Sequence, residues 1–306
     1  MPKLARILVA AAWLGLMTCG PYPEAGVEVL GGPDSPHLRE AVAELTAGLA
    51  PGPVYLHLVS DRDASEDIRR RLRTRRPPLL IVLGTAPLTL IAPVEKKVPI
   101  VFALVGNPYF TGVAAEPRQP HLHQENVTGI FSPPPVAQAL EQGAKLLGPR
   151  PWGLIYDPLE GASLEIKEKF ATLAPAFGIT PLTAAASDAA GDKAALQKLL
   201  SRGAQVMYLP PTKSAGRYGS KLLELGRCRR IMVVSSHPDL RGKGAILQVT
   251  LDYRRLGEEV AVLARRLLSG EAPAGIPLME KVPLRITADE SLLAYWSGYP
   301  PAGRRW

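Results

Sequence analysis

Short apolar runs alternate with amphipathic stretches along most of the chain. The runs at 54–59, 79–83 and 98–104 are each followed by a turn rich in polar residues, glycine or proline. Between such runs, segments such as 36–49 carry apolar residues near helical spacing. The run at 79–83 is wholly apolar, as expected for a strand that is covered on both faces. Strands alternating with helices in this way predict an α/β fold with doubly wound parallel sheets.

The alternation is interrupted in the middle of the chain. The run at 98–104 leads through Asn107-Pro108 into a polar loop, and a second β-like run at 126–131 ends before a triple proline. Strand–helix alternation then resumes. This pattern predicts a chain that leaves one α/β lobe and enters a second one. The gap between two such lobes is a place to hold a small molecule.

Beyond the triple proline, apolar runs and amphipathic stretches alternate as before. In this half we expect strands at 152–156, 180–185, 205–209, 231–234, 245–251 and 282–286, and helices at 134–147, 163–177, 192–201, 214–225, 253–268 and 288–295.

The N-terminus has the features of an export signal. Lys3 and Arg6 precede an apolar run at 7–17 that is too short to span a bilayer as a mature helix. The run ends in LMTC, which looks like the lipobox after which a cysteine is lipidated. We therefore expect residues 1–19 to form a signal segment, with Cys19 carrying the lipid. Ordinary signal cleavage just after it is the alternative.

The charge balance adds little by itself. The chain has 36 Lys and Arg against 28 Asp and Glu, a net charge of +8. An exported protein is not expected to bind nucleic acid, despite this excess. The basic run at 68–76 surrounds most of a predicted helix, which is typical of a solvated helix end. The other interpretation is contact with anionic headgroups, as a second membrane signal beside the lipid.

Several segments, taken in order, resemble one family: the exported substrate-binding proteins of ABC importers, in the subgroup whose better-known members bind tryptophan or tyrosine. The matching segments are IVLGTAP at 81–87, VPIVFALVGNP at 98–108, ENVTGI at 125–130, GLIYDP at 153–158, VMYLPPT at 206–212, GAILQVTLDYRRLGEEVA at 244–261 and LLSGEAPAGIP at 267–277.

This resemblance implies a type I periplasmic-binding fold, with two lobes joined by a three-strand hinge that close on a ligand. Lobe one would comprise 24–130 plus 252–278, and lobe two 131–250 plus 279–306. The implied function is the extracytoplasmic solute-binding component of an ABC importer, whose partners are the permease and ATPase subunits. No catalysis, cofactor or metal is implied.

The candidate ligand-binding residues of lobe one follow its third and fourth strands. Thr85 and Ala86 lie at a strand-to-helix turn, where backbone N–H groups and a hydroxyl can hold an anion. A plain helix start is the alternative. Asn107 occupies the equivalent turn on the next strand, where the family it resembles has an aspartate.

In lobe two the candidates also follow strands. They are Tyr156, Asp157, Thr212 and Ser235. Thr212 stands where the family has an aspartate. A zwitterionic amino acid needs a carboxylate near its ammonium group. Asp157 and Asp252 are the acids that remain, and capping of the long helix that follows is the alternative role for Asp252. The ligand class therefore stays open between an amino acid or aromatic relative and another small molecule.

Other motifs support no separate chemistry. His121 and His123, with Glu125, have spacing that places both imidazoles on one face of an extended segment, but a solvated loop is favoured over a metal site. SSHPD at 235–239 holds Ser, His and Asp as neighbours, whereas a catalytic triad converges from different parts of a fold. Two alternatives to transport remain: a binding-fold lipoprotein that acts as a sensor or through a protein partner, and a less favoured α/β hydrolase.

Overall fold

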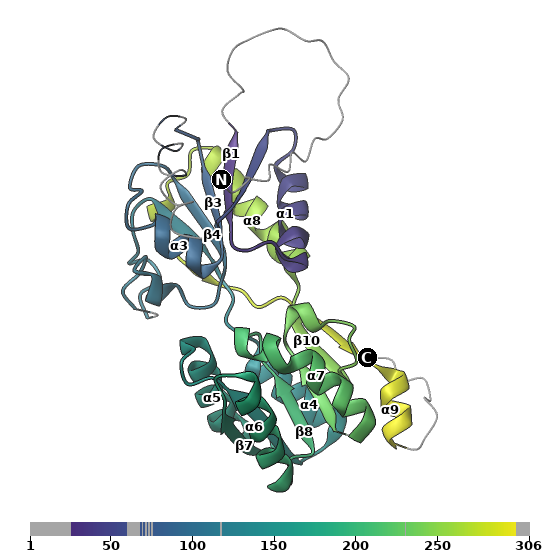
Figure 1. The fold of residues 1–306 in the computed structure, drawn as a ribbon. Helices are drawn as coiled ribbons and strands as arrows, with labels where there is room; N and C mark the ends of the chain where they lie inside the picture. Colours follow the sequence, from purple (N-terminus) through teal and green to yellow (C-terminus); the bar gives the residue numbers. More distant parts are fainter. Residues whose placement is uncertain are drawn as a thin grey trace, which may run out of the picture. The chain divides into compact units, whose positions relative to one another are not determined.

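The structure is a computed structural model, and it describes residues 26–59, 68, 70, 72, 74, 76–116, 118–229 and 231–297. The predicted signal segment, Cys19 and much of the basic run at 68–76 lie outside these residues. The described chain forms two compact units (Figure 1). Unit 1 comprises the residues up to Pro133 and the segment Tyr253–Pro283, and unit 2 comprises Pro134–Asp252 and the residues from Leu284 onward.

Unit 1 is built on a parallel sheet with the strand order β11-β5-β4-β3-β1-β2. Its strands are β1 (Val27–Gly31), β2 (Val54–Leu58), β3 (Leu80–Leu83), β4 (Ile100–Val105), β5 (Val127–Phe131) and β11 (Met279–Glu280), and its helices are α1 (Pro36–Leu49), α3 (Thr85–Ile91), α8 (Tyr253–Leu268) and the 3-10 turns η1 (Pro108–Thr111) and η4 (Pro273–Gly275).

The two faces of this sheet are covered by different helices. Phe102 of β4 packs with Leu88 of α3 in the core on one face. On the other face α1 and α8 lie side by side (Figure 1). Gly257 of α8 makes this close approach possible, because a Cβ there would lie 2.2 Å from the carbonyl oxygen of Ala41. Helix α8, which begins where the chain returns from unit 2 to unit 1, thus completes the core of unit 1.

Unit 2 contains a second sheet, with the order β12-β10-β9-β8-β6-β7, in which β12 alone is antiparallel to its neighbour among the described strands. Its strands are β6 (Pro151–Tyr156), β7 (Thr180–Ala185), β8 (Val206–Leu209), β9 (Met232–Ser235), β10 (Leu247–Leu251) and β12 (Leu284–Ala288), and its helices are α4 (Val136–Leu147), α5 (Gly161–Leu173), α6 (Ala189–Ser201), α7 (Lys213–Arg229), α9 (Glu290–Ser297) and the 3-10 turns η2 (Ala174–Phe177) and η3 (Pro238–Leu240).

Side-chain alternation along β8 shows why this sheet needs helices on both faces. Val206 and Tyr208 belong to the core that includes α4 and α5, whereas Met207 and Leu209 belong to the core that includes α6 and α7. Because successive strand residues point to opposite faces, a wholly apolar strand requires cover on both sides. The predicted α/β class with two doubly wound, mainly parallel sheets is confirmed.

Several predicted element boundaries differ from the observed ones. Helix α6 begins at Ala189, ahead of the predicted start at 192, because the Asp188 carboxylate caps it by accepting the Gly191 N–H at 2.7 Å. Strand β10 begins at Leu247, after the predicted start at 245. The sequence pattern missed β11, whose two residues are too few to show alternation. This strand pairs with β5, and unit 1 accordingly extends to Pro283.

Candidate ligand-binding site

The first candidate group lies where β3 turns into α3. Gly84, with φ of 116°, precedes the helix, and no side chain caps its first turn. Thr85 and Ala86 are exposed. Within the described part of the chain, no acceptor is recorded for their amide N–H groups, which as first-turn donors have no partner inside the helix. This turn therefore presents two hydrogen-bond donors to an acceptor from outside.

Asn107 follows the neighbouring strand, β4, at the same edge of the sheet. Its side-chain oxygen accepts the Tyr109 N–H at 3.0 Å and so caps η1. Just before it, Leu104 has a φ of 56°, and the pairing of β4 with β5 shifts register there. Bulges of this kind redirect the end of a strand. The structure thus gives Asn107 a capping role, and its ligand contact stays a prediction.

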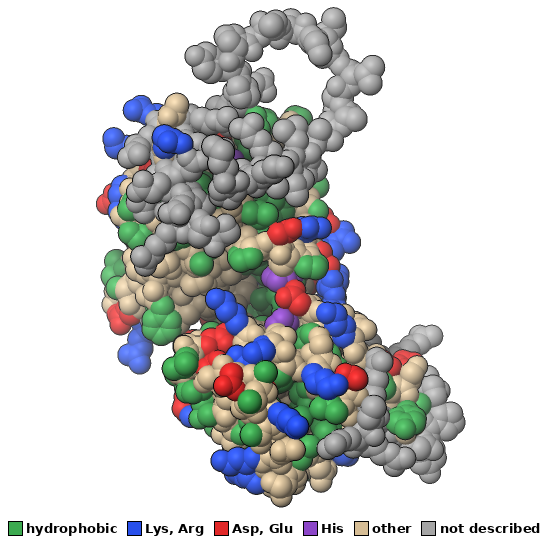
Figure 2. Space-filling view, in the orientation of Figure 1, with side chains coloured by type: hydrophobic (Ala, Val, Ile, Leu, Met, Phe, Trp, Pro, Cys, Tyr) green, Lys and Arg blue, Asp and Glu red, His purple; other side chains and the backbone are tan. Residues whose placement is uncertain are grey.

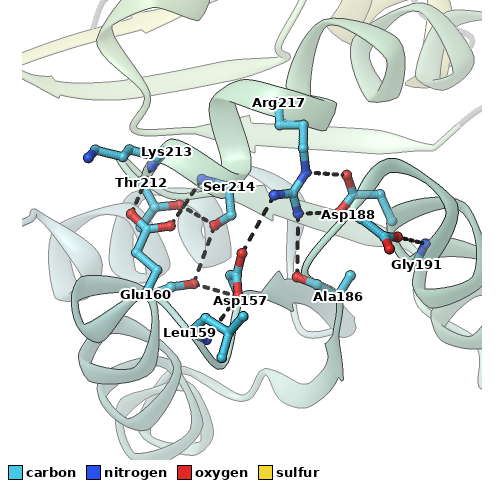
Figure 3. Close-up of polar contacts among 12 residues, drawn as sticks. Asp157, Leu159, Glu160, Ala186, Asp188, Gly191, Thr212, Lys213, Ser214 and Arg217 are labelled. Atoms are coloured by element: carbon cyan, nitrogen blue, oxygen red, sulfur yellow. Dashed lines mark hydrogen bonds and ion pairs between the residues drawn. The ribbon is translucent and has the colours of Figure 1, made fainter.

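In unit 2, Asp157 is held by an ion-pair network. Arg217 of α7 donates to both oxygens of Asp192 in α6, at 2.7 and 2.9 Å. Its remaining nitrogen lies 3.5 Å from Asp157 Oδ2 (Figure 3). The other oxygen of Asp157 accepts the Leu159 N–H at 2.9 Å. Arg217 thereby ties α6 and α7 to the loop after β6.

These contacts set the charge of Asp157. The Leu159 N–H, followed by the Ser187 hydroxyl and Arg217, holds the pKa of the Asp157 carboxyl below its usual value. In turn, the hydrogen bonds from Arg217 to Asp192 and Asp157 raise the pKa of the Arg217 guanidinium. Asp157 is therefore a carboxylate near neutral pH, but its charge already faces a cation of the protein.

A second acid of the same loop caps α7. The two oxygens of Glu160 accept the N–H groups of Lys213 and Ser214, at 2.9 and 3.0 Å (Figure 3). The Thr212 hydroxyl accepts the Ala215 N–H at 3.2 Å. Helix N-termini attract anions because their first N–H groups lack partners. Here the protein supplies the anion itself.

The other two candidates of unit 2 differ in exposure. Tyr156 is half-buried, and Lys167 Nζ lies 5.6 Å from the centre of its ring. Ser235 is fully buried, and its hydroxyl accepts the His237 N–H at 3.2 Å. The neighbouring Ser236 accepts the Tyr208 hydroxyl. A ligand contact by Ser235 stays a prediction, because the side chain is covered in this structure.

The structure thus places Thr85, Ala86 and Asn107 at the carboxyl edge of one sheet, and Tyr156, Asp157, Thr212 and Ser235 at the carboxyl edge of the other. Sequence reasoning missed Glu160 and Arg217. Among the described residues, no group of three or more His, Cys, Asp or Glu side chains is arranged to hold a metal ion. His123 places its two ring nitrogens 3.0 Å from the carbonyl oxygens of Gln124 and Ile276.

Comparison with known proteins identifies the family. The model of the ABC transporter substrate binding protein family matches residues 59–287, so the chain belongs to this family. Comparison with curated protein sequences gives no significant match.

Solved structures share the fold at low identity. A Streptococcus pneumonia ABC domain in complex with L-Trp is 18% identical, with a TM-score of 0.70 over 89% of this chain and 95% of that one. The ligand-free, open structure of a Clostridium difficile substrate binding protein with adhesive properties is 16% identical, with a TM-score of 0.74 over 91% and 96%. A periplasmic ribose ABC transporter protein from Conexibacter woesei is 16% identical, with a TM-score of 0.59 over 91% and 97%. This chain is a divergent member with the type I periplasmic-binding fold.

On the face drawn in Figure 2, Lys and Arg side chains of the described residues are interspersed with acidic and apolar ones. In the part of the chain that the structure describes, no helix is both long and apolar enough to cross a membrane.

Proposed function

We propose that this protein is the extracytoplasmic solute-binding component of an ABC importer, without enzymatic activity, and that it delivers a small molecule to permease and ATPase subunits. The family match over 59–287 is the observation that carries the proposal. The groups proposed to contact the ligand are those at the carboxyl edges of the two sheets, because ligands of open α/β sheets bind there.

The chemistry of these edges favours a ligand with an anionic group. Thr85 and Ala86 offer exposed N–H groups, which suit a carboxylate. At the edge of unit 2, Asp157 faces Arg217 and Glu160 caps α7, so both acids already have protein partners. We therefore propose a carboxylate-bearing small molecule, with an aromatic acid or amino acid as the first class to test.

A thermal-shift screen of the mature protein tests the proposal. The panel contains tryptophan, tyrosine, aromatic carboxylates without the amino group, sugars and nucleosides. A ligand that binds the folded state alone stabilises it by about 2.7 kcal/mol at one hundred times its dissociation constant, or several degrees in midpoint. A response to aromatic carboxylates supports the proposed chemistry. A response to sugars alone contradicts it while leaving the solute-binding role intact.

A second candidate is a binding-fold protein that acts through a protein partner instead of transporting a solute. The uncharged side chains of Asn107 and Thr212 favour it, because both stand where the resembled family has an aspartate. A flat response to every compound in the panel would favour this candidate.

We further propose that the protein is exported, to the periplasm or to the outer face of the membrane. A lipid on Cys19 would anchor it there. Replacing Cys19 with Ser is expected to move the protein from the membrane fraction to the soluble exported fraction, because the thiol that receives the lipid is gone. Fractionation and intact-mass measurement check this. Cys228→Ser, at the other of the two cysteines in the sequence, is the matched control and should leave the membrane fraction unchanged. An unmodified mature chain beginning at Gly20 would exclude the anchor.

A further inference from the structure

A cavity in unit 2 lies apart from the residues discussed so far. It has a volume of about 540 Å³ and is formed by the loop before β10, the strand β12 and the start of α9. The residues that line it include Arg241, Gly242, Gly244, Gln248, Arg285 and Thr287. None of the candidate ligand-binding residues lines this cavity.

Gln248 gives the cavity its chemical character. The residue is 4% exposed, and its side-chain oxygen accepts the Gly242 N–H at 3.1 Å. Because that N–H can only donate, it fixes which atom of the Gln248 amide is the oxygen. The amide nitrogen, Nε2, is buried and has no hydrogen-bond partner among the described residues. Buried donors without an acceptor are rare in proteins, so this one points to an acceptor that comes from outside the chain.

Strand pairing brings further donors to the same face. In the antiparallel ladder of β10 and β12, Gln248 is paired with Thr287, and Thr250 is paired with Arg285. Residues two apart on a strand share a face, so the Gln248, Thr287 and Arg285 side chains lie on one side of the ladder. No ion pair of the Arg285 guanidinium is recorded in the described part of the chain. Amide, hydroxyl and guanidinium donors together match an oxyanion.

Two acids, Asp289 and Glu290, also line the cavity. Asp289 Oδ1 accepts the Leu292 N–H at 3.0 Å and caps α9. Glu290, in the first turn of α9, is exposed to solvent. Gly242 and Gly244, which also line the cavity, adopt φ values of 72° and 103°, a backbone region that favours glycine.

We propose that this cavity binds a small oxyanion, the phosphate or carboxylate group of a small molecule, with the Gln248 amide and the Arg285 guanidinium as its main donors. The β10–β12 ladder ends next to two points where the chain passes from one unit to the other, Asp252–Tyr253 and Pro283–Leu284. An anion that holds loop and ladder together therefore stabilises the segment from which both crossings leave.

Titration of the full mature chain with sodium phosphate and with sodium citrate tests this, at ionic strength matched with sodium chloride. We expect at least one of the two anions to bind saturably. Binding should appear both as a rise in the midpoint of thermal unfolding and as heat in calorimetry. Arg285→Gln and Gln248→Leu should each weaken it roughly tenfold or more, as expected for loss of a charge-assisted hydrogen bond. Arg202→Gln, an exposed arginine of the same unit, is the matched control and should bind as the wild type does.

A second readout follows binding in the wild type itself. The side-chain amide signal of Gln248 in the ¹⁵N spectrum, assigned by its absence in Gln248→Leu, should shift on addition of the anion to the wild type. Binding of phosphate alone or citrate alone supports the site and identifies the class of group. Equal responses in the wild type and all three variants, or no shift of the Gln248 signal by either anion, would overturn the proposal. Neither outcome bears on binding at Thr85 and Ala86.

Discussion

Replacing Arg217 with Met is expected to lower the stability of unit 2 by about 2–3 kcal/mol. The guanidinium makes two hydrogen bonds to Asp192, whose side chain is 7% exposed, and lies 3.5 Å from Asp157. Breaking a buried pair typically costs about 3–5 kcal/mol because the other charge stays buried without a partner. The Arg217 side chain is 31% exposed, so solvent reduces this effect. Denaturant unfolding of the variant measures the loss.

A double-mutant cycle separates the pair from the packing of the long side chain. Arg217→Met combined with Asp192→Leu removes both partners and should recover part of the stability that either single change loses. Lys221→Met is the matched control on the same helix. Its ion pair with Glu224 is exposed on both sides, so a change below about 0.5 kcal/mol is expected. Equal losses in Arg217→Met and Lys221→Met would show that the network contributes nothing to stability.

The fold could be predicted because its signals are local. Four buried residues in a row make β3 apolar throughout, and the apolar spacing of residues 36–49 predicts α1 with its observed bounds. The elements that the sequence pattern did not predict depend on partners far away in the sequence. Strand β11 has two residues and exists because β5 leaves an open edge beside it. No periodicity can develop over so short a segment.

The same distinction applies to the candidate site. Thr85 and Asn107 could be selected because each directly follows an apolar strand, where α/β folds place ligands. Glu160 and Lys213 lie 53 positions apart, and nothing in either local sequence shows that one caps the helix of the other. Arg217 lies in a helix whose pattern predicts an ordinary solvated residue. The contacts that decide which acid is available to a ligand therefore cannot be predicted from local sequence patterns.

The contacts of Asp157 with Arg217 and Leu159 change the role expected of this acid. Asp157 was one of two carboxylates expected to remain for a ligand ammonium, yet it has a cation of the chain beside it and a depressed pKa. Because its folded-state pKa is below the unfolded value, the stability that it contributes is present above the unfolded pKa and is lost as the pH falls through the folded one. A ligand ammonium would have to share Asp157 with Arg217, whereas a ligand carboxylate finds open donors after β3.

Replacing Thr85 with Pro is therefore expected to weaken binding of the ligand found in the screen by roughly tenfold or more, because it removes one of the N–H groups proposed to contact the anionic group of the ligand. Proline is well tolerated at the first position of a helix, where the N–H has no partner within the helix. The midpoint of unfolding without ligand should therefore stay close to that of the wild type. Isothermal titration calorimetry measures the affinity, and thermal unfolding measures the stability.

Thr85→Ala separates the backbone from the hydroxyl, since it keeps the N–H and loses the side-chain oxygen. If the amide carries the contact, Thr85→Ala should bind nearly as well as the wild type while Thr85→Pro does not. Thr89→Ala, on the exposed side of the same helix, is the matched control. Wild-type affinity in Thr85→Pro would place the anionic group of the ligand elsewhere. A loss of equal size in Thr85→Ala and Thr85→Pro would assign the contact to the hydroxyl, so that the first turn of α3 acts through its side chain and not through its helical backbone.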